Sequence, residues 1–299
     1  MAGKAKGVAK TIGVIGGSGL YEMEGLTAVK AVRVKTPFGD PSDEYMTGML
    51  GDVRLVFLPR HGRGHRKLPS ELNYRANIFG MKKLGVEWII SVSAVGSMKE
   101  EIKPGHMVIV DQFFDRTKGR PSTFFGDGIV GHVEFADPVC AELASVLYDA
   151  AKAAGAVVHR GGTYLCIEGP QFSTRAESNI YRKWGVDVIG MTNIPEAKLA
   201  REAEICYATI ALSTDYDCWH VSEESVTIDM ILDTIRKNVS TAKEIIRRAA
   251  PAISPSRGCR CASALANAVI TDKKAIPSKT MKRLELLLGK YAGKGKGGR

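Results

Sequence analysis

Short runs of apolar, largely β-branched residues alternate with longer amphipathic stretches along most of this 299-residue chain. Continuous apolar runs of this length are typical of strands buried on both faces of a parallel sheet. They occupy residues 12–15, 55–58, 88–92, 107–110, 186–189 and 207–212. The stretches between them with helical spacing are 73–84, 138–154, 175–184 and 195–203. This alternation predicts an α/β fold: one three-layer domain with a central mixed, mostly parallel sheet flanked by helices.

Two further helices are predicted toward the C-terminus. Apolar residues recur at helical spacing from Ile228 to Ile246, which indicates a long core-packing helix. Residues 278–288 place four apolar side chains on one face, which predicts a short C-terminal helix. Because prolines and a glycine follow Ala250, we divide the chain into a basic extension (1–10), a main domain (11–250) and a C-terminal appendix (251–299).

The formal net charge of +10 suggests at first a nucleic-acid or membrane partner. The charge lies at the two ends, however: three lysines in residues 1–10, and nine lysines and arginines against one glutamate in 273–299. The body between them is nearly neutral, so we expect no specific nucleic-acid partner. A tail beginning at Gly289 has little apolar content and is expected to be mobile. No run approaches the roughly 18 apolar residues of a membrane span.

Glycines interrupt the apolar stretch near the N-terminus before it reaches signal-peptide length, so a cytoplasmic location is expected. Most of the six cysteines should then be reduced core residues. Cys259 and Cys261 are one residue apart beside Gly258, and three roles stay open for them: a redox-active pair, a strained disulfide, or pairing with other cysteines. No second cysteine or histidine pair with ligand spacing lies near them in sequence, so no metal site is expected.

Three expected strands end in small, hydroxyl-bearing or basic residues. Ser18 lies in a glycine turn, Arg60 and His61 follow the second strand, and Ser93 and Ala94 end the third. Ligands of open α/β sheets bind beyond the carboxyl ends of strands, where small residues let backbone amides approach an anion. The glycine turn fits neither the dinucleotide fingerprint nor a P-loop. The sequence therefore predicts an anion site, with the Arg60 guanidinium gripping a phosphate bidentately.

Longer motifs identify the relationship. They occupy residues 16–20, 36–39, 60–62, 73–77, 94–97, 111–113, 168–172, 191–192 and 214–219. Through them, residues 12–250 resemble the trimeric class of the purine nucleoside phosphorylase family, in particular its branch acting on 5′-methylthioadenosine. The resemblance implies a nucleoside phosphorylase-like fold. It stops before the Cys259-Arg260-Cys261 region and the basic tail.

The resemblance also implies site residues. Those at the positions of the family's phosphate pocket are Ser18, Arg60, His61, Ser93, Ala94 and Thr192. Ser18 and Ser93 stand where the family often has threonine, which keeps the hydroxyl. The implied nucleoside contacts are Phe172 against the purine, Ser173, Met191 under the ribose, Ile228 and Leu232 around the sulfur, and His132 from a neighbouring subunit.

Asp215 and Asp217 carry the substrate prediction. They follow the run 207–212, and residues two apart in an extended chain point the same way. A carboxyl group can protonate or position a proton at purine N7 during cleavage of the glycosidic bond. A carboxylate also accepts a hydrogen bond from the 6-amino group, whereas phosphorylases that prefer 6-oxopurines usually have asparagine at one of these positions. The pair therefore favours adenine.

The implied activity is phosphorolysis of 5′-methylthioadenosine to adenine and 5-methylthioribose 1-phosphate, a pentosyl transfer in purine and methionine salvage. Phosphate is then a co-substrate, no metal or organic cofactor is expected, and the enzyme is expected to be a homotrimer or a hexamer. One alternative is a phosphorylase acting on adenosine or on 6-oxopurine nucleosides, including methylthioinosine; a hydrolase is another. Outside enzymes, the alternatives are nucleic-acid binding through the tail and a catalytically silent nucleoside sensor.

Overall fold

The protein is described here by a computed structural model of residues 10–17, 19–220 and 228–292, the side chains of 228–232 and 292 excepted. The strands are β1 (Thr11–Gly16), β2 (Thr27–Val32), β3 (Tyr45–Leu50), β4 (Val53–Pro59), β5 (Trp88–Ser97), β6 (Met107–Ile109), β7 (Gln112–Arg116), β8 (Val158–Arg160), β9 (Thr163–Ile167), β10 (Val188–Gly190) and β11 (Cys206–Tyr216). The α-helices are α1 (Tyr74–Lys83), α2 (Ala141–Ala153), α3 (Arg175–Lys183), α4 (Asn193–Glu202), α5 (Ile228–Ala252) and α6 (Ser278–Ala292). Short 3-10 helices are η1 (Pro69–Glu71), η2 (Arg260–Ser263) and η3 (Lys273–Ala275).

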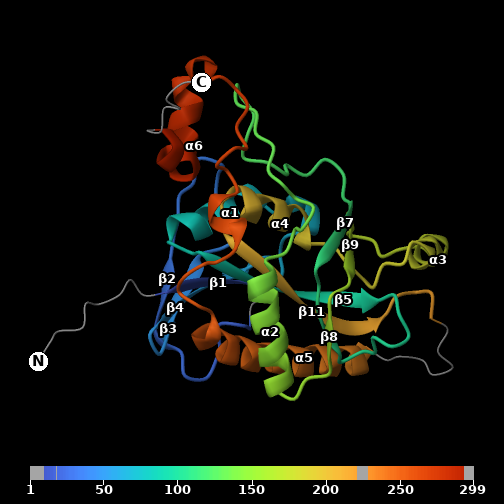
Figure 1. Cartoon of the computed structure of the whole chain (residues 1–299). Coiled ribbons are helices and arrows are strands. Elements are labelled where there is room, and N and C mark those ends of the chain that lie inside the picture. Colours follow the sequence, from blue (N-terminus) through green and yellow to red (C-terminus); the bar gives the residue numbers. More distant parts are fainter. Residues whose placement is uncertain (1–9, 18, 221–227, 293–299) are drawn as a thin grey trace, which may run out of the picture.

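A mixed sheet of 11 strands in the described residues forms the centre of the molecule (Figure 1). Its main path runs β2-β3-β4-β1-β5-β10-β9-β7, while β11 pairs with β5 and β6, and β6 pairs with β8. The central pairs β1·β4, β1·β5 and β5·β11 are parallel, and β2·β3 and β3·β4 are antiparallel. The predicted α/β class with a mixed sheet is confirmed.

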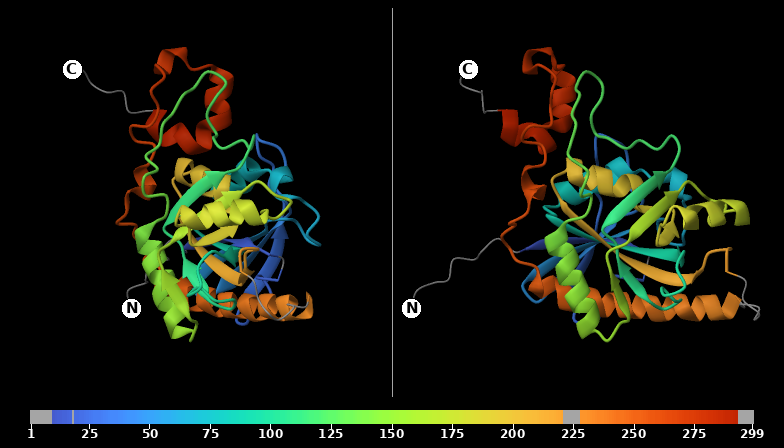
Figure 2. Two further views of the ribbon diagram at one scale, coloured as in Figure 1. Left: turned by 90° about the vertical axis from the view of Figure 1, so that its right-hand side faces the viewer. Right: turned by 45° about the vertical axis from the view of Figure 1, so that its right-hand side comes forward.

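Strand alternation divides the interior between the two faces of the sheet. On β1, Ile12 and Val14 belong to the cluster that contains α2 and α5, whereas Ile15 belongs to the cluster that contains α1, α4 and α6. On β5, Ile90 belongs to the cluster with α2 and α5, and Ile89 belongs to the cluster with α1, α4 and α6. Because successive side chains of a strand point to opposite faces, each buried strand supplies both clusters. Figure 2 shows the resulting layers, with α5 below the sheet, α1 and α4 above it, and α3 projecting at one end.

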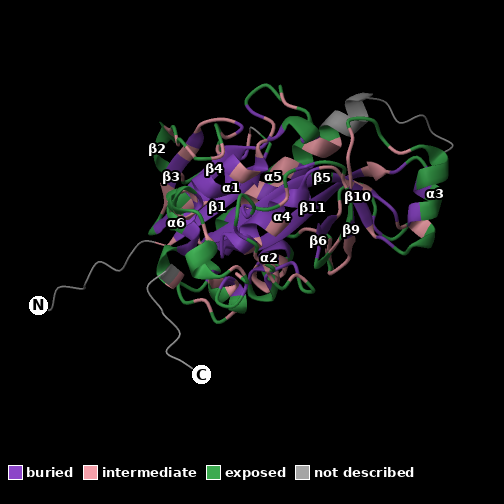
Figure 3. Ribbon diagram, turned by 90° about the horizontal axis from the view of Figure 1, so that it is seen from above, coloured by how far each residue is buried: buried purple, intermediate pink, exposed green. Residues whose placement is uncertain are grey.

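All six expected strands and all six expected helices are present, with ends shifted by a few residues. The strands that the pattern missed are β2, β3, β7, β8 and β9. Strand β2 is almost wholly exposed and β7 largely so, because both lie at ends of the sheet path. Figure 3 shows the exposed strand β2 at the outside of a buried centre. A strand that buries little needs no apolar run, so apolar runs could not reveal β2 and β7.

Helix α6 extends beyond the expected 278–288, and the prediction of a mobile tail from Gly289 is wrong as far as Tyr291. Leu284, Leu287 and Leu288 are buried in the α1/α4 cluster. Lys290 forms an ion pair with the buried carboxylate of Glu204, and the Tyr291 hydroxyl donates to the same group at 2.5 Å. These contacts with Glu204 stabilise the last turn of α6, where the sequence has few apolar residues. Among the described residues, no helix is long and apolar enough to cross a membrane.

Replacing Leu287 with alanine is expected to lower the free energy of unfolding by about 2–5 kcal/mol, because it leaves a cavity in a packed core. The matched control is Leu286→Ala one position away, where the side chain is exposed and the expected change is within about 0.5 kcal/mol. Denaturant unfolding followed by circular dichroism measures both. Equal stability of the two variants would mean that α6 does not contribute to the core.

Candidate active site

A cavity of about 690 Å³ lies where several strands of the sheet end. Its wall includes Gly17 after β1, Arg60 after β4, the second half of β5, Met191 after β10 and the end of β11. The cavity brings together these predicted residues: Arg60, His61, Ser93, Ala94, Phe172, Ser173, Met191, Thr192, Asp215 and Asp217. Of the other predicted residues, Ser18 and the side chains of Ile228 and Leu232 lie outside the described residues. The site is thus at the sheet edge that the strand-end motifs predict.

Hydroxyl groups gather around Ser93 on β5. The Ser93 Oγ lies 3.0 Å from the Tyr164 hydroxyl and 3.4 Å from the Thr192 Oγ1. All three side chains are buried, and burial raises the pKa of Tyr164, which keeps its hydroxyl protonated and able to donate. Beside them, Ala94 is exposed to the cavity. Neutral donors that can rotate toward an anion are suited to binding phosphate. Tyr164 was not identified from the sequence, where it reads only as an aromatic in an apolar stretch.

The structure corrects the expectation that Arg60 grips phosphate bidentately. Its guanidinium is only 3% exposed, and its Nε and Nη2 donate to the two carboxylate oxygens of Glu196 at 2.9 Å each. Nη2 also donates to Ser91 Oγ at 2.7 Å, and Nη1 donates to the Val92 carbonyl at 2.9 Å. The two adjacent N–H groups that could bind a phosphate bidentately are therefore already hydrogen-bonded to a carboxylate. Only the second hydrogen of Nη1 is left to contact an anion in the cavity.

Glu196, on α4, is the partner that the sequence did not reveal. Its carboxylate is fully buried and also accepts from Ser91 Oγ at 3.0 Å and from the Tyr207 hydroxyl at 2.9 Å. Burial by itself would lower the pKa of Arg60, but the charge of Glu196 and the hydrogen bonds that it accepts from the guanidinium, with smaller contributions from Tyr207 and Tyr164, together raise that pKa. In sequence, Glu196 is an acidic residue in the first turn of a helix, a common position for a solvent-exposed charge. Only the fold shows that it faces the sheet.

His61 is a neutral group of defined tautomer. Its Nδ1 lies 2.8 Å from the carbonyl oxygen of Lys67, so Nδ1 carries the proton and donates it. Burial lowers the pKa of His61 to about 4, and the charge of Arg60 lowers it further, against the effect of the Lys67 carbonyl. The other nitrogen, Nε2, therefore presents a lone pair. It can accept a hydrogen bond from the hydroxyl of monohydrogen phosphate but cannot donate one.

A β-bulge directs the two aspartates into the cavity. The pairing of β11 with β5 joins Ser213 to Val95 and Asp215 to Gly96, so Thr214 is an extra residue on β11. A Cβ at Gly96 would lie 3.3 Å from Asp215 Oδ1, so the glycine lets this carboxylate lie against β5. Asp215 is half-buried and Asp217 is buried, and the Asp217 backbone amide donates to the Ser97 carbonyl at 3.1 Å. Both aspartates line the cavity, as predicted.

Asp215 is in an environment that favours its protonated form. Burial raises the pKa of Asp215, and the neighbouring Asp217 charge raises it further. A hydrogen bond from Thr214 Oγ1 to Asp215 Oδ2, 2.6 Å long, acts in the opposite direction. A half-buried carboxyl group with a raised pKa is a suitable proton donor to a leaving group.

Apolar side chains complete the wall. Ile235 and Val239 of α5 line the cavity, and they follow Ile228 and Leu232 at spacings of three and four residues on one helix face. Ile228 and Leu232 were predicted as site residues from the sequence, whereas Ile235 and Val239 were not, although all four share the same helical periodicity. The Phe172 ring lies at the rim and is 84% exposed.

Arg120 is a second buried arginine that the sequence did not reveal. Its Nη1 donates to the carbonyls of Met191 and Ile194 at 2.7 and 2.9 Å, and its Nη2 donates to the Glu168 carbonyl at 2.6 Å. Its Nε donates to the Glu168 carboxylate at 3.0 Å. These bonds fix the loops that carry Met191 and Phe172. Arg120 is therefore a positioning residue of the cavity wall.

His132 does not line this cavity. It lies at a second cavity of about 490 Å³, whose lining shares no described residue with the first. The His132 amide donates to the carbonyl of Ala268 at 2.8 Å, which ties its loop to the C-terminal segment. Within one chain His132 cannot be counted in the site, and its assignment to a neighbouring subunit stays a prediction.

Comparison with known proteins places this cavity in a family. The model of the phosphorylase superfamily matches residues 11–251. An S-methyl-5′-thioadenosine phosphorylase of Geobacter sulfurreducens is 68% identical over 94% of this chain and 99% of its own length, and one of Koribacter versatilis is 60% identical over 96% and 98%.

Two solved structures agree. A methylthioadenosine phosphorylase from an antarctic soil metagenomic library has a TM-score of 0.90 and 51% identity, covering 94% of this chain and 99% of its own. A mutant of adenosine/methylthioadenosine phosphorylase from Schistosoma mansoni, in complex with adenine, has a TM-score of 0.79 and 38% identity, covering 86% and 96%. With a cavity of this composition at the predicted sheet edge, the chain belongs to the phosphorylase superfamily.

Proposed function

We propose that the protein cleaves 5′-methylthioadenosine with inorganic phosphate, giving adenine and 5-methylthioribose 1-phosphate. The observation that carries this is a single cavity that combines hydroxyl groups suited to phosphate with a pair of carboxyl groups and an apolar wall. The relatives named as S-methyl-5′-thioadenosine phosphorylases support the same substrate.

The pairing of β5 with β11 spaces the reacting groups. Ser93 and Ala94 of β5 lie beside Ala211 and Leu212, and Gly96 lies beside Asp215. From Ser93 to Gly96 the strand advances by about 10 Å. This separation leaves room for a ribose between a phosphate near Ser93 and a base near Asp215.

Phosphate is held by neutral donors and one N–H group of the Arg60 guanidinium, and it attacks C1′ of the ribose. Ser93, Thr192, the amide of Ala94 and the free hydrogen of Arg60 Nη1 contact its oxygens, and His61 Nε2 accepts from its hydroxyl. As the glycosidic bond lengthens, the sugar gains oxocarbenium character. The phosphate dianion, kept close in a site of low polarity, stabilises this positive charge. The chemistry needs no metal or organic cofactor.

Asp215 delivers a proton to N7 of the departing purine, so that adenine leaves as a neutral molecule. Burial raises the pKa of Asp215, so this carboxyl group takes up a proton more readily than a free aspartate does. Asp217 accepts a hydrogen bond from the 6-amino group of adenine, a group that 6-oxopurines lack. The aspartate pair therefore argues against hypoxanthine and guanine nucleosides, and the apolar residues of α5 favour the methylthio group over the hydroxyl of adenosine.

The quaternary state and location complete the proposal. We place the enzyme in the cytoplasm as a homotrimer in which His132 of one subunit closes the nucleoside site of another. Support comes from the position of His132 away from the cavity of its own chain and from the exposed Phe172 ring at the rim.

The test is to incubate the protein with 5′-methylthioadenosine, adenosine or inosine, each with and without phosphate, and to identify the released base and sugar. We expect adenine and 5-methylthioribose 1-phosphate, only when phosphate is present. Release of adenine and free methylthioribose without phosphate would mean hydrolysis, and preferential cleavage of inosine would exclude the proposed substrate.

A further inference from the structure

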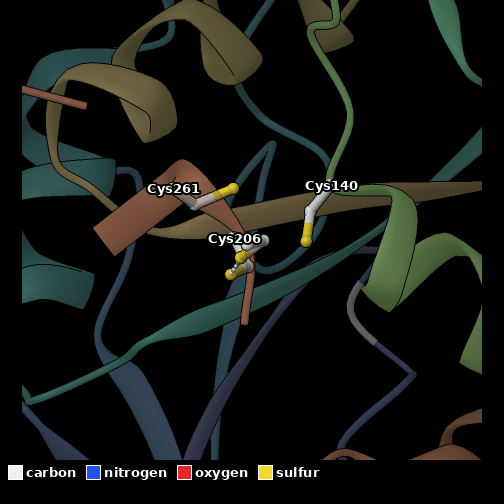
Figure 4. Close-up of side chains that lie close together, drawn as sticks. Cys140, Cys206 and Cys261 are labelled. Carbon is white, nitrogen blue, oxygen red and sulfur yellow. Dashed lines mark hydrogen bonds between the residues drawn. The ribbon is translucent and has the colours of Figure 1, made fainter. Parts of the chain in front are cut away.

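Four of the six cysteines converge far from the cavity. The sulfur atoms of Cys140, Cys206, Cys259 and Cys261 all lie within 4.8 Å of one another, and those of Cys206 and Cys259 are 3.4 Å apart. Figure 4 shows three of them approaching from separate segments: Cys140 before α2, Cys206 at the start of β11, and Cys261 in η2. We call these four residues the thiol cluster.

The spacing fits a tetrahedral site. Zinc binds thiolates at about 2.3 Å, and four such bonds in tetrahedral arrangement place the sulfur atoms about 3.8 Å apart. The sulfur atoms of the thiol cluster are therefore at distances that one ion can span with small rotations. Three of the cysteines are buried and Cys259 is partly exposed, so water has little access to such an ion while the ion still has an entry path.

The surroundings favour negative charge on the sulfur atoms. Cys140 is the N-cap of α2, so the helix directs its positive end at the cluster. Cysteine binds a metal as the thiolate, so the positive end of the helix assists the loss of the thiol protons that metal binding requires.

The segment that carries two of the cysteines is held in place independently. Arg257 donates from Nη1 to the Glu204 carbonyl at 2.8 Å and from Nη2 to the Glu87 carboxylate at 2.9 Å, and its guanidinium lies over the Trp88 ring. On the other side, the Cys140 amide donates to the Tyr207 carbonyl at 2.9 Å. The ligands are thus positioned by contacts that do not involve sulfur.

We propose that Cys140, Cys206, Cys259 and Cys261 bind one Zn²⁺ ion as a tetrathiolate, which fastens η2 and the C-terminal segment to α2 and β11. On binding, each thiol releases its proton to solvent and the ion loses its water ligands; no electron is transferred, and the site carries a formal charge of −2. Four protein ligands leave no open position for a substrate, so the site is structural. The expectation of no metal site assumed ligands close in sequence, whereas the fold supplies Cys140 and Cys206 from distant segments.

The site is distinct from the proposed catalytic centre. Cys206 begins β11 and Asp215 lies nine residues along it, a distance of about 30 Å. Zinc in the thiol cluster therefore cannot touch phosphate or nucleoside, and its effect on catalysis is through stability alone.

The experiment is a Co²⁺ titration of the full-length wild-type protein after chelation and reduction, because tetrahedral cobalt thiolates absorb intensely in the visible and near ultraviolet. We expect these bands to saturate at one cobalt per chain and to disappear when Zn²⁺ is added. The zinc-loaded protein should also melt at a higher temperature than the chelated protein. Elemental analysis of protein purified with reductant should find about one zinc per chain.

Variants separate this site from any other thiol. Cys140→Ser and the double variant Cys259→Ser/Cys261→Ser should lose the cobalt bands, while Cys166→Ala, which removes a buried thiol outside the cluster, should keep them. The proposal is overturned if wild-type protein binds no cobalt with thiolate absorption, or if the bands persist in both cluster variants. Zinc-free protein whose mass is lower by two hydrogens for each of two disulfides would equally overturn it.

Discussion

Replacement of Asp215 by asparagine is expected to lower kcat by about 10²–10⁴-fold, because the amide cannot transfer a proton to N7 of the leaving base. The matched control is Asp217→Asn, which keeps the proton donor and changes the group facing the 6-position. It should weaken the preference for adenine over hypoxanthine nucleosides. Steady-state kinetics with both nucleosides measure the two effects. A kcat near that of wild type in Asp215→Asn would contradict the assignment of the acid.

The pH profile provides a separate readout of the same residue. Burial raises the pKa of Asp215, and only the protonated acid can deliver the proton, so kcat should fall as pH rises through this pKa. The alkaline limb should be absent from the residual activity of Asp215→Asn. Thr214→Val removes the hydrogen bond that favours the carboxylate, so it should move the limb to higher pH. If the alkaline limb of the pH profile stays at the same pH in Thr214→Val, the limb belongs to another group.

Arg60→Ala is expected to lower the free energy of unfolding by about 3–5 kcal/mol, because it leaves the Glu196 carboxylate buried without a counter-charge. It should also raise the KM for phosphate more than the KM for nucleoside, since in the proposed mechanism the second hydrogen of Nη1 contacts the phosphate. Denaturant unfolding and initial-rate kinetics measure the two effects. Unchanged stability would contradict the buried ion pair.

A neutral double variant distinguishes these two roles. Arg60→Met combined with Glu196→Gln removes both charges, and the glutamine oxygen can still accept from Ser91 and Tyr207. It should recover most of the lost stability while the KM for phosphate stays high. If stability and phosphate affinity recover together, Arg60 acts on the anion only by maintaining the fold.

Local sequence pattern predicted the layers of this protein well, because the burial of a strand or an amphipathic helix determines where apolar residues stand in its own sequence. Local pattern does not reveal which distant residue a side chain will contact. Arg60 was placed correctly at a strand end, but nothing near it in sequence indicates Glu196, which meets it from 136 residues away. The four cysteines are a similar case, since their proximity depends on where α2, β11 and η2 come together. The missed edge strands β2 and β7 bury too little to need an apolar pattern.

The bulge at Thr214 decides which side of the sheet receives the side chains of Asp215 and Asp217. Along β11, Ile210 and Leu212 are even-numbered residues on one face, and regular alternation would continue with 214 and 216. The inserted residue changes the parity, so that Asp215 and Asp217 join Leu212 in the cavity wall. A strand that paired Thr214 regularly, without the bulge, would turn both carboxyl groups away from the site. One residue that contributes no catalytic group of its own thus determines whether this sheet edge can be an active site.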